Sequence, residues 1–120
     1  MDIEEFKRNR EALHKKVMDF AGKNMKAFHH LDWKVYEPGA LDKKTKQMLG
    51  LVASMVLRCD DCIAYHLTRC AEEGVSSGEL EEAMTVAVMV GGSIIIPYLR
   101  RAVKVWEALG NTVKETEEKK

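Results

Sequence analysis

The chain has 120 residues, which suits a single domain with a modest hydrophobic core. Its 19 basic and 19 acidic side chains balance, so nothing in the net charge favours binding to nucleic acid or to an anionic membrane. The first residues are acidic, unlike those of a secretory leader. The longest apolar stretch, residues 83–99, is interrupted and too short to cross a bilayer. We therefore expect a cytoplasmic protein without a membrane partner.

Helical periodicity dominates the sequence, which predicts an all-α fold. From residue 3 to residue 28, apolar side chains recur at steps of three, four and seven, and we predict one long amphipathic helix there. Its apolar stripe consists of Ile3, Phe6, Leu13, Val17, Phe20, Met25 and Phe28. Residues 31–41, which contain Pro38 and Gly39, are predicted to connect this helix to the next one.

The second predicted helix begins after Asp42, a suitable N-cap, and continues to about Leu57. Because it is apolar on most of its faces, we expect it to be deeply buried. Residues 58–61 are predicted to hold the end of this helix and the start of a third one, which runs to about Glu73, and Gly74 suits the left-handed residue that closes a helix.

Ser76 and Glu79 have the spacing of a capping box and are predicted to open a fourth helix, which ends at two consecutive glycines. Ser93 is then predicted to cap a fifth helix with Pro97 in its first turn, where the missing N–H costs nothing. That helix is expected to end near Gly110.

Residues 1–110 therefore form one predicted domain, followed by a polar tail at residues 111–120. Several of the helices are apolar on more than one face, which a chain of this length cannot easily bury alone. A symmetric oligomer would cover these faces, and a tightly packed monomeric bundle is the alternative.

The segment with recognisable chemistry is a C-x-x-C pair followed by a histidine. At helical spacing Cys59 and Cys62 are about 60° apart and rise about 4.5 Å along the axis, so they are neighbours on one face. His66 lies one turn beyond Cys62 on that face. In a cytosolic protein this spacing favours redox chemistry of the thiols, with metal binding or a structural role as alternatives.

Several neighbours influence ionisation of these thiols. The start of a helix, the basic His66 and the positive charge of Arg58 favour a thiolate. The carboxylates of Asp60 and Asp61 oppose it. We expect the balance to lower the pKa of the cysteine pair.

The Cys and His side chains of this helix cannot all coordinate one metal ion. Cys62 and Cys70 would be separated by about 12 Å along the axis, more than twice the roughly 2.3 Å of a zinc–sulfur bond, so at most three of the four Cys and His side chains could share a metal. We expect Cys70 to be a small buried hydrophobic residue and predict no metal or organic cofactor. His14 and the pair His29-His30 are expected at a surface or interface.

Aromatic residues offer a second set of candidates. Trp33, Tyr36 and Trp106 either line a substrate pocket or, as we expect, pack in the core or at an interface. Tyr65 is expected to point to a different face from His66 and to have no catalytic role.

From Leu41 to Leu109 the sequence resembles the carboxymuconolactone decarboxylase-like family, in particular its alkylhydroperoxidase D-like branch. The resemblance is carried by Cys59-x-x-Cys62-x3-His66, Glu73-Gly74-Val75, Ser76-x-x-Glu79 and the Gly91-Gly92 break. It implies an all-α fold that assembles into homo-trimers or homo-hexamers. It also implies a thiol-dependent hydroperoxide reductase whose cysteines cycle between dithiol and disulfide, with a hydroperoxide as substrate and a thiol or lipoyl-type carrier as reductant.

Carried onto this chain, the resemblance makes Cys62 the attacking thiolate, Cys59 the resolving thiol and His66 the proton relay. A local argument favours Cys59 instead as the more exposed and acidic sulfur, because it is nearer the helix start. Two positions depart from the branch: Gln47 replaces a glutamate and Asp61 replaces a histidine, so the relay is incomplete. Gln47 can orient an imidazole but cannot act as a base. The alternatives are a non-redox helical oligomer with metal-binding or structural Cys and His residues, and a lactone decarboxylase of the same family.

Overall fold

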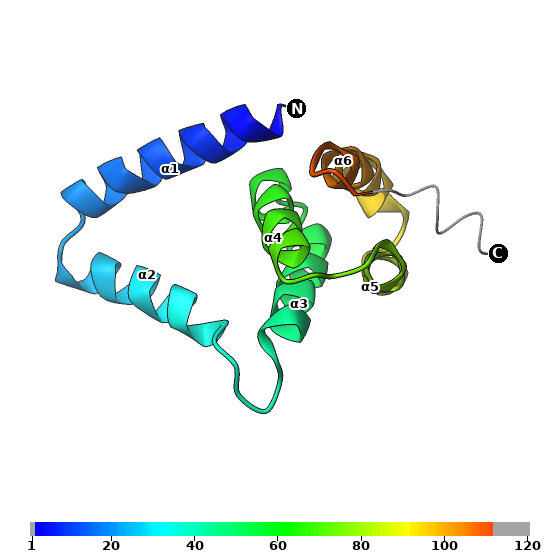
Figure 1. Ribbon diagram of the computed structural model, residues 1–120, viewed down its shortest axis with the longest axis horizontal. Coiled ribbons are helices and arrows are strands. Elements are labelled where there is room, and N and C mark those ends of the chain that lie inside the picture. The colour runs from blue at the N-terminus through cyan, green and yellow to red at the C-terminus, as the bar shows by residue number, and fades with distance from the viewer. Residues whose placement is uncertain (1, 112–120) are drawn as a thin grey trace.

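The computed structural model describes residues 2–111, and this part of the chain contains helices and no strands, as predicted (Figure 1). The helices are α1 (Ile3–Phe20), α2 (Lys23–Val35), α3 (Lys43–Val56), α4 (Asp60–Glu72), α5 (Ser77–Gly91), the short 3-10 helix η1 (Ser93–Ile95) and α6 (Ile96–Ala108). The predicted tail lies outside the described residues except for Asn111.

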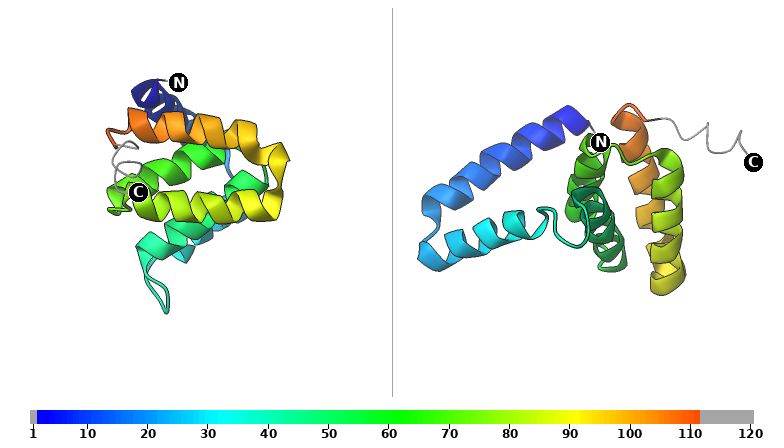
Figure 2. Two further views of the ribbon diagram at one scale, coloured as in Figure 1. Left: turned by 90° about the vertical axis from the view of Figure 1, so that its right-hand side faces the viewer. Right: turned by 60° about the horizontal axis from the view of Figure 1, so that its bottom comes forward.

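Helices α1 and α2 form an arm that extends away from the other helices (Figures 1 and 2). The prediction of one helix over residues 3–28 is therefore wrong. Ala21 and Gly22 adopt extended backbone conformations between the two helices, and glycine is a poor helix former. Helix α2 also continues to Val35, so the connector is shorter than the predicted residues 31–41.

Helices α3 to α6 form the core. Helix α3 packs on both α4 and α5, and α4 packs on α6. The largest completely buried apolar side chains lie where these helices meet: Leu51, Met55, Leu67, Leu80, Ile95 and Trp106. The indole Nε1 of Trp106 donates a hydrogen bond of 2.9 Å to the hydroxyl of Ser77, which joins α6 to the start of α5. The core thus holds α4, and with it the cysteine pair, between α3 and α6.

Most predicted helix boundaries are confirmed by their caps. Asp42 accepts from the backbone N–H of Thr45 at 2.8 Å, Ser76 and Glu79 form the full capping box, and Gly74 has a φ of +77°. The predicted cap at Ser93 is wrong, because residues 93–95 form the 3-10 turn and α6 starts at Ile96 without a side-chain cap. Pro97 does lie in the first turn of α6.

Two surfaces carry apolar side chains that the described residues leave exposed. On the arm these are Leu13, Val17, Phe20, Met25, Phe28, Leu31, Trp33 and Val35, and on α5 they are Val86, Met89 and Val90. Within residues 2–111, no helix has both the length and the apolar character required to cross a bilayer.

Candidate functional site

The turn between α3 and α4 brings the two cysteines together. Arg58 has a φ of +61° and turns the chain, after which the N–H of Cys59 donates to the carbonyl of Ser54 at 3.1 Å. Cys59 is the N-cap of α4, and its sulfur accepts from the backbone N–H of Cys62 at 3.3 Å. The two Sγ atoms are 2.6 Å apart, about 0.5 Å more than a disulfide bond. Both cysteines are free thiols in this structure.

Cys62 is exposed and Cys59 is half-buried. The hydrogen bond with Cys59, followed by burial and by the negative charges of Cys59 and Asp61, raises the pKa of Cys62 to about 11, and Arg10 acts in the opposite direction. The expected lowering is therefore wrong for Cys62 in the dithiol. A second sulfur 2.6 Å away disfavours a negative charge more than the surrounding groups favour it.

His66 lies in the same region but inside the protein, with 8% of its surface exposed. Its Nδ1 is 2.9 Å from Oε1 of Gln47, itself 1% exposed, on α3. Because an amide oxygen only accepts hydrogen bonds, this contact places the ring proton on Nδ1 and leaves Nε2 with a free lone pair. Burial, with a smaller effect of the positive charges of Arg10 and Arg69, lowers the pKa of His66 to about 4, while Asp32 opposes the shift. The imidazole is therefore neutral at physiological pH.

Sequence reasoning missed Gly50, against which the imidazole packs. A Cβ atom at Gly50 would lie 2.5 Å from Cε1 of His66, 2.8 Å from Nδ1 and 2.9 Å from Nε2. Only glycine leaves room for the ring at this distance from the α3 backbone. A glycine inside an otherwise good helix was the available signal, because such a residue usually has a packing reason.

The arm contributes Tyr36 to the site. Its ring centroid is 5.5 Å from that of His66, and burial, followed by the negative charges of Asp32, Tyr65 and Cys62, raises the pKa of Tyr36. Tyr65 adjoins the imidazole, with centroids 5.2 Å apart, but its ring contacts Arg10 of α1 while His66 packs against α3, so it points to a different face as expected. Adjacent side chains diverge at Cα, but two rings of this size still meet edge to face.

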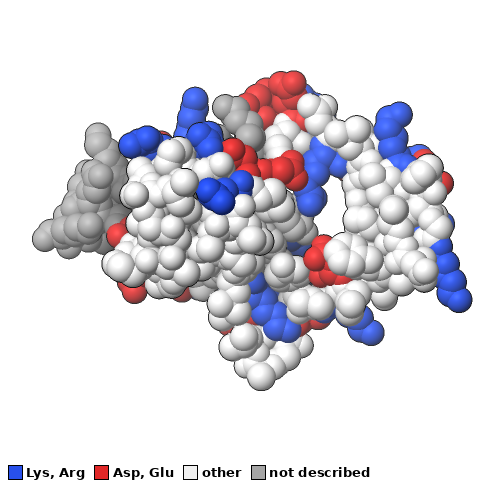
Figure 3. Space-filling model, turned by 180° about the vertical axis from the view of Figure 1, so that it is seen from behind, with Lys and Arg blue, Asp and Glu red and all other residues white. Residues whose placement is uncertain are grey.

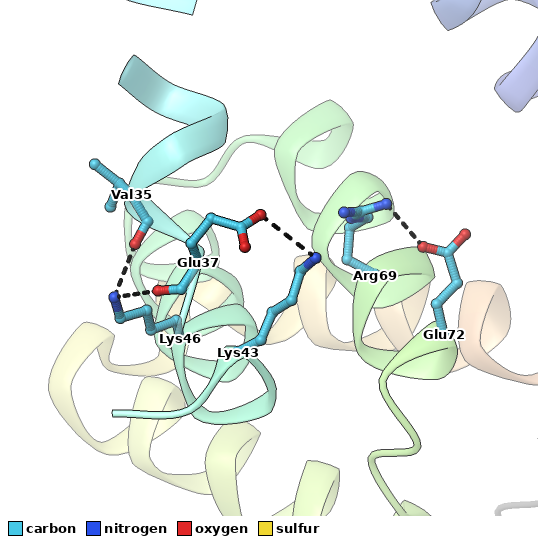
Figure 4. Close-up of polar contacts among 6 residues, drawn as sticks. All are labelled: Val35, Glu37, Lys43, Lys46, Arg69 and Glu72. Atoms are coloured by element: carbon cyan, nitrogen blue, oxygen red, sulfur yellow. Dashed lines mark hydrogen bonds and ion pairs between the residues drawn. The ribbon is translucent and has the colours of Figure 1, made fainter. Parts of the chain in front are cut away.

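Lys46 fixes the end of the arm on α3 (Figure 4). Its Nζ donates to the carbonyls of Val35 at 3.0 Å and Glu37 at 2.8 Å, and Lys43 is 3.9 Å from the Glu37 carboxylate. Tyr36 is the residue between those two carbonyls. These bonds therefore hold the loop that carries the tyrosine towards His66.

The remaining sequence candidates lie in the core or on the arm. Cys70 is completely buried as expected, and burial, with a smaller effect of Glu73, raises its pKa to about 12. His14 and His29 pack edge to face on the arm, with centroids 5.2 Å apart. Trp106 is in the core and Trp33 is exposed. Among the residues that the structure describes, no three His, Cys, Asp or Glu side chains converge as metal ligands.

The model of the carboxymuconolactone decarboxylase family matches residues 22–105. A curated relative, "Uncharacterized protein 4 in cox locus" of Paracoccus denitrificans, is 30% identical over 83 residues, which cover 69% of this chain and 75% of the relative.

Crystal structures of proteins from Thermotoga maritima and Legionella pneumophila are similar to this one. One from Thermotoga maritima has 52% identity and a TM-score of 0.86, covering 97% of this chain and 98% of that one. Another from the same organism has 52% identity and a TM-score of 0.82, covering 96% of this chain and 94% of that one. That protein is described as a carboxymuconolactone decarboxylase family protein with a suggested involvement in antioxidative response. A Legionella pneumophila family protein, 24% identical with a TM-score of 0.82 over 89% and 96%, shares the fold. The matched profile and these relatives show that the chain belongs to the carboxymuconolactone decarboxylase family.

Proposed function

We propose that the protein is a thiol-dependent hydroperoxide reductase that uses Cys59 and Cys62 as a redox pair. The observation that carries this proposal is the 2.6 Å separation of the two sulfurs at the exposed start of α4. Two thiols this close can be joined by a disulfide without rearrangement of the helices around them. The antioxidative role suggested for the Thermotoga maritima protein, which is 52% identical, supports the same chemistry.

The reaction has two steps. The Cys62 thiolate attacks the terminal oxygen of the hydroperoxide, the O–O bond breaks, and the alkoxide takes up a proton and leaves as an alcohol, while Cys62 becomes a sulfenic acid. Cys59 then attacks that sulfur, which forms the disulfide and releases water. A dithiol or lipoyl-type reductant returns the pair to the thiol form. The greater exposure of Cys62 supports its assignment as the attacking sulfur.

His66 and Gln47 serve as the proton relay in this proposal. The hydrogen bond from Nδ1 to Gln47 leaves Nε2 free to accept a proton, and the low pKa of His66 keeps the ring neutral at physiological pH but makes it a weak base. Gln47 orients the imidazole and takes no proton itself. A reducing compartment such as the cytoplasm keeps the resting pair as thiols.

Replacing single cysteines tests the redox role. With excess dithiothreitol, we expect steady consumption of cumene hydroperoxide by the native protein and loss of turnover in both Cys62→Ser and Cys59→Ser. Cys70→Ser is the matched control and should retain turnover, because Cys70 is buried in the core. Unchanged turnover in Cys62→Ser would contradict the proposal, and stoichiometric zinc in the purified protein would favour a metal-binding role instead.

We also propose a homo-oligomer, a trimer or a hexamer. It is supported by the exposed apolar side chains of the arm and α5, an arrangement typical of surfaces that are buried on assembly. Light scattering should give a mass three or six times that of the 13.6 kDa chain, and the mass of a single chain would contradict it.

A further inference from the structure

Arg10 reaches from α1 to the turn of α4 that carries Cys62. Its guanidinium carbon lies 3.8 Å from the ring centroid of Tyr65, and its Nε is 4.0 Å from the carboxylate of Asp61. Asp61 immediately precedes Cys62, and Tyr65 follows it by one turn, so Arg10 spans the segment of α4 where the attacking sulfur is placed. No spacing in the sequence indicates this contact, because the two segments are far apart in the chain.

Arg10 is the basic residue of α1 that contacts this turn of α4. Between α1 and α4 lies a groove of about 280 Å³, whose lining includes Lys7, Arg10, Tyr65, Arg69 and Glu72. Figure 3 shows from behind the opening between the arm and the remaining helices, with basic and acidic side chains at its edges. Arg69 pairs with Glu72 at 3.0 Å, and Lys7 is 3.9 Å from Glu4 (Figure 4 shows the first pair).

Other charged or titratable groups are on α4 and on the elements next to it. The N-cap of α4 is Cys59, and the helix itself supplies Asp60, Asp61, Tyr65 and His66. Asp32 is on α2, and Tyr36 is the C-cap of α2. Arg58 is in the α3–α4 turn, and Arg101 is on α6. Arg101 is held by Asp60 at 3.0 Å, and Arg58 is exposed and belongs to the turn. Within this set, Cys59 and the carboxylate of Asp61 oppose a Cys62 thiolate, and Arg10 is the guanidinium whose charge favours it.

From this geometry we propose that Arg10 is a positioning residue of the hydroperoxide reductase: its guanidinium, held between Tyr65 and Asp61, stabilises the Cys62 thiolate. The role rests on the proposed function and deepens it. The sequence predicted α1 only as part of an amphipathic helix. The proposed role of Arg10 means that α1 also helps to activate the sulfur of Cys62. Asp61 acts in two ways, since it holds Arg10 in place and also places a negative charge beside the thiolate.

The test measures thiolate formation without any hydroperoxide. In a Cys59→Ser background, Cys62 is the exposed thiol and Cys70 remains buried, so the pH midpoint of alkylation by iodoacetamide reports on Cys62. We expect Arg10→Gln to raise this midpoint by about half to one pH unit. Arg10→Lys should restore most of the difference, which a purely structural role would not explain. Arg8→Gln is the matched control, since Arg8 is on the same helix and exposed on a different face, and it should leave the midpoint unchanged.

Equal midpoints in Arg10→Gln and Arg8→Gln, with unchanged circular dichroism, would overturn the role of Arg10. A midpoint in Arg10→Lys as high as that of Arg10→Gln would do the same. Because alkylation requires no hydroperoxide, an altered midpoint together with absent peroxide turnover would support the role of Arg10 and reject the proposed reaction. The two measurements therefore distinguish a failure of the proposed role of Arg10 from a failure of the proposed hydroperoxide reduction.

Discussion

Gly50→Ala is expected to destabilise the protein by about 1 to 3 kcal/mol, the usual cost of overpacking a well-filled interior. Alanine normally stabilises a helix relative to glycine by up to about 1 kcal/mol, so the sign of this prediction opposes simple helix propensity. The reason is the 2.5 Å approach between the new Cβ and Cε1 of His66, which forces the ring away from α3 and from Gln47. Urea unfolding measures the change in the free energy of unfolding.

A second helical glycine provides the control for this substitution. In Gly78→Ala the new Cβ would meet only the Ser76 hydroxyl, at an ordinary 3.8 Å. We expect that variant to be as stable as the native protein or more stable, by up to about 1 kcal/mol. If both variants are stabilised alike, the imidazole does not pack against Gly50 as the structure indicates.

His66 is expected to make the fold sensitive to mild acid. The pKa of His66 is about 4 in the folded protein and about 6.5 for a free side chain, so below pH 6.5 the unfolded chain binds a proton that the folded chain does not. The contribution of the neutral His66 to the free energy of unfolding is complete above pH 6.5. It falls as the pH drops towards 4, and the total loss is about 3 kcal/mol. Native stability should therefore decline over this window.

A histidine variant separates this effect from that of the carboxylates, which also titrate in acid. His66→Gln is expected to be less stable at pH 7, because it loses the packing and the hydrogen bond to Gln47, but to lose less stability between pH 6.5 and pH 4. His30→Gln is the control at an exposed position and should follow the native curve. Parallel curves for the native protein and His66→Gln would show that the imidazole is not buried in its neutral form.

Local signals in the sequence predicted most of the helices. Asp42, the pair Ser76 and Glu79, and Gly74 act through contacts within a few residues, so their spacing was sufficient to place helix ends. The break at Gly22 was missed because the apolar periodicity continues across it. Ser93 failed as a cap because the chain forms a 3-10 turn there before α6 begins.

Helical spacing predicted the candidate site only where it lies on one helix, whereas the contact of Gln47 with His66, which joins α3 to α4, was expected from the family resemblance. Cys59, Cys62 and His66 follow each other at helical spacing, so their common location could be inferred. The contacts of Gly50, Tyr36 and Arg10 join different helices, and no spacing within the sequence indicates which residues meet across such contacts. The raised pKa of Cys62 has the same origin, because it depends on the distance between the two sulfurs and on burial.

The most direct test of the redox pair is to locate the bond that a hydroperoxide creates. Trypsin cleaves after Arg58 and Arg69, so residues 59–69 form one peptide that contains both Cys59 and Cys62, and Cys70 begins the next peptide. After one equivalent of hydroperoxide and alkylation of free thiols, we predict a peptide 59–69 that is unalkylated and lighter by two hydrogen atoms. Full alkylation of both cysteines in that peptide, at a hydroperoxide concentration that oxidises a control dithiol, would contradict the account.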